Sequence, residues 1–182
     1  APRQERGKRE DLVLPESEGH FEIIQPAEEY NKQGIANTKK GNFALAILDF
    51  NKAIEIQPKY PQAYHNRGQA YFAKGDQSKA ISEYNKSLEL DPSYALVYYD
   101  RALAYAALKD YPQVIADCTK VIKMHAGFGG VYSLRGSIYN IMREYDKALA
   151  DFLEAKARGE KINPDFLREL KALVNEKTNS AK

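Results

Sequence analysis

Residues of similar size recur every 34 positions along this chain of 182 residues. One column consists of tyrosines alone, and four others hold the same spacing over four units. Five columns in register indicate an array of repeated structural units rather than one irregular domain. The columns are Tyr30, Tyr64, Tyr98 and Tyr132; Gly34, Gly68, Ala102 and Gly136; Ala46, Ala80, Val114 and Ala148; Phe50, Tyr84, Cys118 and Phe152; and Ala53, Ser87, Val121 and Ala155.

Each unit is predicted to form two helices joined by a short turn. In the second unit, apolar residues up to Phe72 fall at the spacing of one helix face, and the pattern resumes after Gly75. Glycine suits the turn because a positive φ costs it little, and Pro92 ends the second helix because it cannot continue the hydrogen-bond ladder. Helices joined so tightly approach closely only where side chains are small, which explains the columns of Gly68 and Ala80.

The pattern of Tyr, Gly, Tyr, Ala, Phe or Tyr, Ala and Pro on this period resembles the tetratricopeptide repeat (TPR). The resemblance covers about three quarters of the chain, and pentatricopeptide RNA readers have a longer period and a different pattern. It implies an all-α right-handed superhelix of four helix-turn-helix repeats plus a C-terminal capping helix. The third unit departs most, since Val114 and Cys118 replace a small and an aromatic residue. The four repeats are assigned to 27–60, 61–94, 95–128 and 129–162.

Two segments flank the repeats. Residues 1–26 are charged and rich in turn formers, which predicts a mostly flexible N-terminal segment, and whether it occupies the groove of the array is open. Pro164 marks a helix start, and residues 163–177 are expected to form the capping helix, with Leu170 where the repeats carry a small residue. Residues 178–182 are expected to be a flexible tail. The capping helix would cover the open end of the array.

The resemblance implies that the first helices of the repeats line a concave groove. The expected lining mixes amides, an imidazole, a carboxylate and aromatic rings, which suit a peptide backbone and its side chains. The candidate partner-binding residues are Asn31, Ile35, His65, Asn66, Gln69, Phe72, Tyr99, Asp100 and Leu103.

Some tetratricopeptide co-chaperones hold the C-terminal carboxylate of a heat-shock chaperone with Lys, Arg and Asn side chains. At the five matching positions only Asn66 has the required type, and Asp100 places a negative charge where a cation must meet the carboxylate. The sequence therefore argues against a carboxylate-clamp chaperone tail as the partner. The matching positions are Asn31, Ile35, Asn66, Leu96 and Asp100.

Two charged columns of opposite sign share the period. We interpret them as a structural staple, in which each arginine pairs across helices with an acid of its own or the preceding repeat, rather than as an anion site. The columns are Arg67, Arg101 and Arg135, and Asp49, Glu83, Asp117 and Asp151.

The remaining composition points to a protein without cofactor, metal or active site. The 27 basic and 25 acidic residues nearly balance, which gives no support to a nucleic-acid partner, and most tyrosines fall in core columns. No stretch is long and apolar enough for a membrane span. Cys118 is the single cysteine of the sequence, so an intramolecular disulfide is excluded. The three histidines are far apart in the sequence and have no metal-ligand spacing. We expect a soluble protein and favour the cytoplasm slightly; export or an organelle stays open, because a chain beginning at Ala1 is compatible with processing.

The sequence thus predicts a non-catalytic scaffold or adaptor that binds an extended peptide or a partner helix in its concave groove. The alternative is structural self-assembly into a homo-oligomer through the N-terminal segment or the ends of the array. An enzyme is the weakest of the three hypotheses, because no catalytic constellation is found.

Overall fold

The computed structural model describes residues 26–124 and 127–180, and this part of the chain folds into nine α-helices without a strand. The prediction of an all-α fold is confirmed. Predictions for residues 1–25 lie outside the described residues. The helices are α1 (Ala27–Lys39), α2 (Phe43–Ile56), α3 (Pro61–Ala73), α4 (Gln77–Leu90), α5 (Ala95–Ala107), α6 (Tyr111–Lys123), α7 (Gly129–Ile141), α8 (Tyr145–Ala157) and α9 (Pro164–Ser180).

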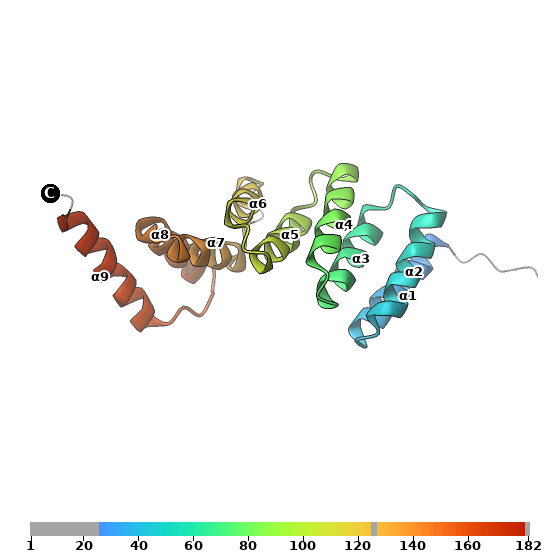
Figure 1. Cartoon of the computed structure of the whole chain (residues 1–182), viewed down its shortest axis with the longest axis horizontal. Coiled ribbons are helices and arrows are strands. Elements are labelled where there is room, and N and C mark those ends of the chain that lie inside the picture. Colours follow the sequence, from blue (N-terminus) through green and yellow to red (C-terminus); the bar gives the residue numbers. More distant parts are fainter. Residues whose placement is uncertain (1–25, 125–126, 181–182) are drawn as a thin grey trace, which may run out of the picture.

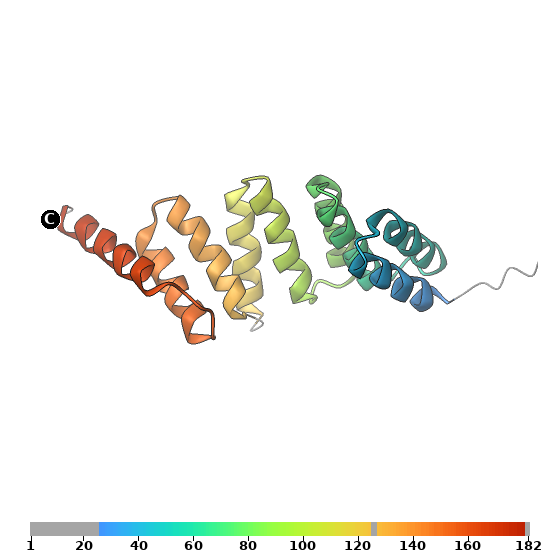
Figure 2. The same cartoon turned by 90° about the horizontal axis from the view of Figure 1, so that it is seen from below.

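The helices form hairpins that follow one another along an elongated array, with α1 and α9 at opposite ends (Figures 1 and 2). Every helix contacts the next one along the chain, both within a hairpin and between hairpins. In addition α1 contacts α3, and α3 contacts α5, whereas the second helices of successive hairpins make no comparable contact. The first helices of these three repeats therefore lie closer together and form the inner side of the array.

The turn inside each hairpin contains one residue with a left-handed backbone. Gly41 and Gly75 adopt φ values of 78° and 85°, and Lys109 and Arg143 adopt 61° and 58° at the same position of the third and fourth repeats. A side chain costs about 1–2 kcal/mol in this conformation, and glycine avoids that cost. The turn geometry is thus retained in all four repeats even where the glycine is not.

Close approach inside the first two hairpins depends on a glycine that faces an aromatic ring. A Cβ at Gly34 would lie 2.5 Å from Cε1 of Phe50, and one at Gly68 would lie 2.6 Å from Cε1 of Tyr84. Both rings are almost completely buried. Glycine is required at these positions because any side chain would overlap the ring.

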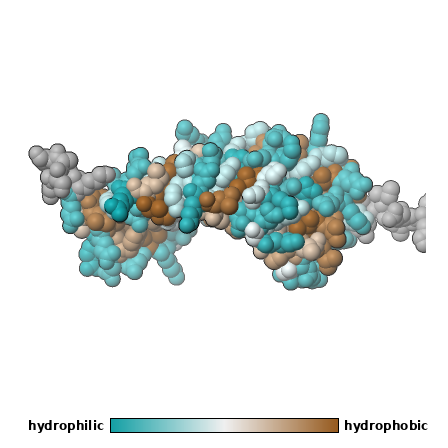
Figure 3. Space-filling view, viewed as in Figure 1, coloured by the Kyte–Doolittle hydropathy of each residue, from teal (hydrophilic) through white to brown (hydrophobic). Residues whose placement is uncertain are grey.

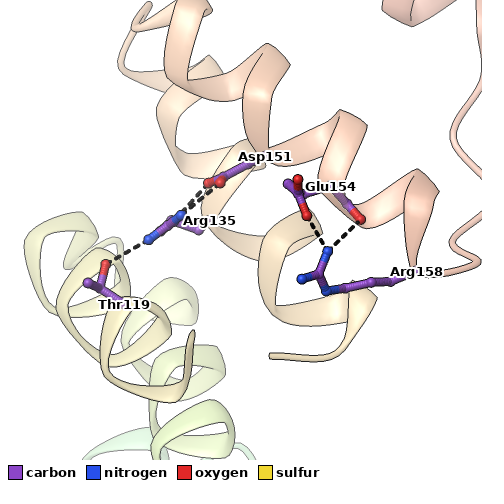
Figure 4. A network of polar contacts seen from close by, with 5 residues as sticks. All are labelled: Thr119, Arg135, Asp151, Glu154 and Arg158. Atoms are coloured by element: carbon purple, nitrogen blue, oxygen red, sulfur yellow. Dashed lines mark hydrogen bonds and ion pairs between the residues drawn. The ribbon is translucent and has the colours of Figure 1, made fainter. Parts of the chain in front are cut away.

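The arginine staple is confirmed and is larger than predicted. Arg135 donates to both carboxylate oxygens of Asp151 at 2.8 Å, and it also donates through Nη1 to Oγ1 of Thr119, 2.9 Å away on the preceding repeat (Figure 4). Each guanidinium therefore joins three helices from two repeats. The equivalent contacts are Arg67 with Glu83 and Asn51, and Arg101 with Asp117 and Asn85.

Helix α9 packs on the last repeat. Leu167 and Leu170 are buried against α8, and the ring of Phe166 meets that of Phe152 edge-on at 5.1 Å between centroids. The helix continues to Ser180, past the boundary that we predicted at 177, because no Gly or Pro interrupts the segment after Val174. Residues 178–180 of the predicted tail are therefore helical.

Candidate peptide-binding groove

The candidate groove residues lie on the first helices of the first three repeats. Helix α1 carries two of them, α3 carries four, and α5 carries three. Their exposure differs, because Asn31 and His65 are 6% and 2% exposed while the others are half-buried. The two buried side chains are held inside the protein and do not form an open binding surface.

Asn31 and Asn66 bind each other. Nδ2 of Asn66 donates to Oδ1 of Asn31 at 2.9 Å, which joins α1 to α3. This bond uses one donor and one acceptor of the two amides, so each has fewer groups left for a ligand than the sequence suggested. Ile35 packs against the buried cluster around Phe50. These three residues thus hold the first two repeats together.

A polar network connects α3 to α5. One oxygen of Asp100, Oδ2, lies 2.6 Å from Nε2 of His65 and also accepts a hydrogen bond of 2.8 Å from Nε2 of Gln69. The imidazole is enclosed by the rings of Tyr84 and Tyr94, at 5.9 and 5.1 Å between centroids, and its Nδ1 is buried without a hydrogen-bond partner. The network fixes the position of the Asp100 carboxylate.

A pocket of about 310 Å³ opens beside this carboxylate. It is formed by four helices, α1, α3, α4 and α5, and it combines polar groups with two aromatic rings and a leucine. Oγ1 of Thr38 on its wall donates to the backbone oxygen of Gly34 at 2.9 Å. The lining residues are Thr38, Gln69, Phe72, Tyr84, Asp100 and Leu103.

The structure brings four of the nine candidate residues to this pocket and adds Thr38 and Tyr84. Sequence reasoning assigned Tyr84 to the core column that faces Gly68, which is correct for one side of its ring, since the residue is only 1% exposed. The periodic position of Tyr84 in the sequence could not show that the other side of its ring borders a pocket. Tyr99 lies elsewhere, with its ring edge-on to that of Phe128 at 4.8 Å.

The negative charge of Asp100 affects the pKa of two nearby tyrosines. Burial raises the pKa of Tyr84, and the nearby carboxylate of Asp100 raises it further. Burial and the same carboxylate also raise the pKa of Tyr94. Within the described part of the chain, no side-chain nitrogen of a Lys or Arg lies within 4 Å of a carboxylate oxygen of Asp100.

The described residues contain no group of three or more His, Cys, Asp or Glu side chains that could hold a metal ion. Cys118 is fully buried, and burial raises the pKa of its thiol to about 12, so it is a protonated core residue rather than a nucleophile. Among the described helices, none has the length and apolar character to cross a membrane.

The family model described as TPR repeat matches residues 34–75 and again residues 68–109, the second match displaced by the 34-residue period. Residues 34–109 therefore contain tetratricopeptide repeats. A search of curated protein sequences gives no significant match.

Solved structures of several proteins, TPR proteins among them, have the same fold. MamA is 25% identical to this chain and superposes with a TM-score of 0.69 over 72% of this chain and 77% of MamA. A thermophilic TPR protein of Thermus thermophilus, TTC0263, is 22% identical, with a TM-score of 0.64 over 84% of each chain. The first TPR of Spaghetti (RPAP3), solved with the HSP90 peptide SRMEEVD, is 24% identical, with a TM-score of 0.63 over 66% of this chain and 95% of that one.

Proposed function

We propose that this protein is a non-catalytic scaffold that binds an extended peptide or a partner helix along the inner side of its repeats. The observation that carries the proposal is the pocket between α1, α3, α4 and α5, where a fixed carboxylate lies beside apolar walls. Pockets that combine apolar surface with a few positioned polar groups are the usual sites of ligand recognition. The TPR fold, whose solved members include one with a bound peptide, is consistent with this role.

Different residues of the pocket provide apolar contact and hydrogen bonding. Phe72 and Leu103 are half-buried and offer apolar surface for a side chain of the partner, while Gln69 retains an amide oxygen that can accept a hydrogen bond from a peptide N–H. Apolar anchors supply most of the affinity at such sites, and the polar groups set orientation.

We further propose that a free C-terminal carboxylate is not the ligand. The third repeat would have to supply cations at the positions of Leu96 and Asp100, and it supplies an exposed leucine and a carboxylate. A carboxylate next to Asp100 would be repelled. Binding of the peptide SRMEEVD at submicromolar Kd would contradict this part of the proposal.

The function is tested by affinity capture of partners from the source cell on two immobilised variants. Phe72→Ala with Leu103→Ala removes the apolar walls of the pocket, and we expect it to lose the partners that the wild type retains. The matched control is Leu90→Ala with Leu153→Ala, which truncates two side chains on α4 and α8 that are 38% and 41% exposed. Equal capture by wild type and pocket variant, with both folded by circular dichroism, would contradict the proposal.

Self-assembly is the second candidate function, and one surface of α2 favours it. Leu45 and Leu48 are exposed on α2, where the equivalent positions of α4 carry the polar residues Lys79 and Ser82. Figure 3 shows apolar patches among the mostly polar side chains of the face that it displays. Exposed apolar surface of this kind can mark a contact between proteins.

The two functions are separated by sedimentation. If α2 mediates self-association, the mass of the wild type should rise with concentration, and Leu45→Lys with Leu48→Ser should return it to the monomer mass. A monomer mass for the wild type across the concentration range would exclude this candidate and leave the groove proposal untouched.

A further inference from the structure

We infer that the pocket beside Asp100 selects a basic side chain, a lysine or arginine, of the bound partner. The inference rests on the proposed function, because it names which residue of the peptide the groove recognises. It follows from the free oxygen of the Asp100 carboxylate, the chemistry of the walls around it, and the pairing of every nearby arginine with another acid.

The charges of the inner helices isolate Asp100. Helices α3, α5 and α7 together contain only four residues of the types Asp, Glu, Lys and Arg, of which three are the staple arginines. Each of those guanidiniums is bound to an acid of its own repeat at 2.7 or 2.8 Å. Asp100 is the fourth charged residue; its contacts are with His65 and Gln69, and no lysine or arginine of these helices pairs with it.

The carboxylate of Asp100 is half engaged. Its Oδ2 interacts with both His65 and Gln69, whereas no hydrogen bond or ion pair within the described residues reaches Oδ1. The side chain is 14% exposed, and its residue borders the pocket. One oxygen is therefore held by the protein, and the other remains available to a donor that enters the pocket.

A partner that covers this pocket must compensate the carboxylate. Removing water from a carboxylate without supplying a cation or strong donors is unfavourable, and more so than for a neutral polar group. A neutral or acidic side chain would leave that cost uncompensated. An ammonium or guanidinium would form a charge-assisted hydrogen bond with Oδ1.

The walls fit the rest of a basic side chain. Phe72, Tyr84 and Leu103 provide apolar surface for the methylene groups of lysine or arginine, which pack readily against such surface while the charged head reaches a polar group. The rings of Phe72 and Tyr84 also attract a cation through their faces. A small metal ion would find only one free carboxylate oxygen here and would not use the rings.

The inference is tested with peptides blocked at both ends, so that no terminal charge takes part. Four degenerate pools carry lysine, arginine, norleucine or glutamate at a fixed central position, with uncharged residues elsewhere. Binding of each pool to the full chain is measured by fluorescence polarisation. For the wild type we expect the lysine and arginine pools to bind about tenfold or more tightly than the norleucine pool, and the glutamate pool to bind most weakly.

Three variants assign the preference to Asp100. Asp100→Asn keeps an oxygen that can accept from His65 and Gln69 but removes the charge, and it should abolish the tenfold preference. Asp100→Glu keeps the charge and should retain a preference for basic pools. The matched control is Asp146→Asn, which removes one exposed carboxylate from the first turn of α8 and should leave the preference unchanged.

The outcomes distinguish the inference from the proposed function. Equal binding of all pools by the wild type would overturn the inference and leave the groove proposal standing, since peptides would still bind. A basic preference that survives in folded Asp100→Asn would also overturn it, because another group would be responsible. Failure of every pool to bind would overturn both. If Asp100 only stabilised the fold, the wild type would bind all four pools equally.

Discussion

The second and third repeats solve the same packing problem with different pairs of side chains. In the second, Gly68 on α3 faces the ring of Tyr84 on α4; in the third, Ala102 on α5 and Cys118 on α6 occupy the same two positions. The larger residue on one helix is matched by the smaller on the other, and a methyl group becomes acceptable where the ring is absent. The size that one position accepts thus depends on the residue at the other position.

The difference has a consequence for function. Because Tyr84 fills the second repeat, its ring reaches the inner side and borders the pocket that contains Asp100. Cys118 is too short to do the same and is fully buried. Tyr84 therefore forms both part of the core of its repeat and a wall of the proposed binding site, whereas Cys118 forms only part of the core.

Four predictions test this comparison, beginning with the largest expected effect. The first concerns how tightly the third repeat is packed. Burial raises the pKa of the Cys118 thiol from 9.0 to about 12, so at pH 8 the native thiol should be alkylated at least about a thousandfold more slowly than the urea-unfolded chain. The measurement is the rate of iodoacetamide labelling followed by mass spectrometry.

The sign of this shift also sets a pH dependence. The folded pKa lies above the unfolded one, so the thiol's contribution to stability is complete below about pH 9 and is lost as pH rises towards 12. The wild type should lose more stability than Cys118→Ala between pH 9 and 11. Fast labelling of the native protein would show that the third repeat is loosely packed and would break the comparison.

The second prediction compares truncations at the two large positions. Tyr84→Ala should lower the free energy of unfolding by about 3–5 kcal/mol, as expected for removal of a buried ring. Cys118→Ala removes one sulfur atom and should cost about 1 kcal/mol. Urea denaturation of both variants gives the two values. Equal losses would contradict the proposal that the ring of Tyr84 fills more of the core in its repeat than Cys118 does in the next.

The third prediction concerns the small positions. Gly68→Ala should cost about 1–3 kcal/mol, because the new Cβ would lie 2.6 Å from the ring of Tyr84. Ala102→Gly should cost only about 1 kcal/mol, the usual penalty for glycine within a helix. Combining Gly68→Ala with Tyr84→Cys recreates the pair of the third repeat, and a double-mutant cycle should show favourable coupling of about 0.5–3 kcal/mol. Additive losses would show that the size accepted at position 68 does not depend on the residue at position 84.

The fourth prediction has the smallest expected difference. The arginine staple is built alike in both repeats, so double-mutant cycles on Arg67 with Glu83 and on Arg101 with Asp117 should each give about 0.5–3 kcal/mol of coupling. The two values should agree within about 0.5 kcal/mol, because in both repeats the guanidinium donates twice to the acid and once to an asparagine of the preceding repeat. A large difference would show that core and staple are not independent.

Periodicity allowed the helices, the hairpin order and the partners within each staple to be predicted from sequence, because each of these depends on residue type at a repeated position. The contacts that build the site repeat in position but not in residue type. His65 and Asp100 stand one period after Asn31 and Asn66, and each pair is in contact, but only the later pair combines an imidazole with a carboxylate. These contacts were not predicted, because they also depend on side-chain rotamers that the spacing does not determine.

The burial of particular polar residues could not be predicted from the sequence either. His65 and Asn31 were interpreted as groove residues because their helix positions face inward, yet both are covered by neighbouring side chains. The enclosing rings of Tyr84 and Tyr94 come from the following helix and the loop after it. Which inward positions stay open is decided by the size of such neighbours.

The reach of each staple arginine into the preceding repeat affects how the array can come apart. If one hairpin opens, the next loses an acceptor for its guanidinium, and a half-buried cation is left with an unmade bond. Opening at one place therefore weakens the adjoining unit. Thermal melting of the four hairpins should consequently be a concerted event, with shortened versions of the chain disproportionately fragile.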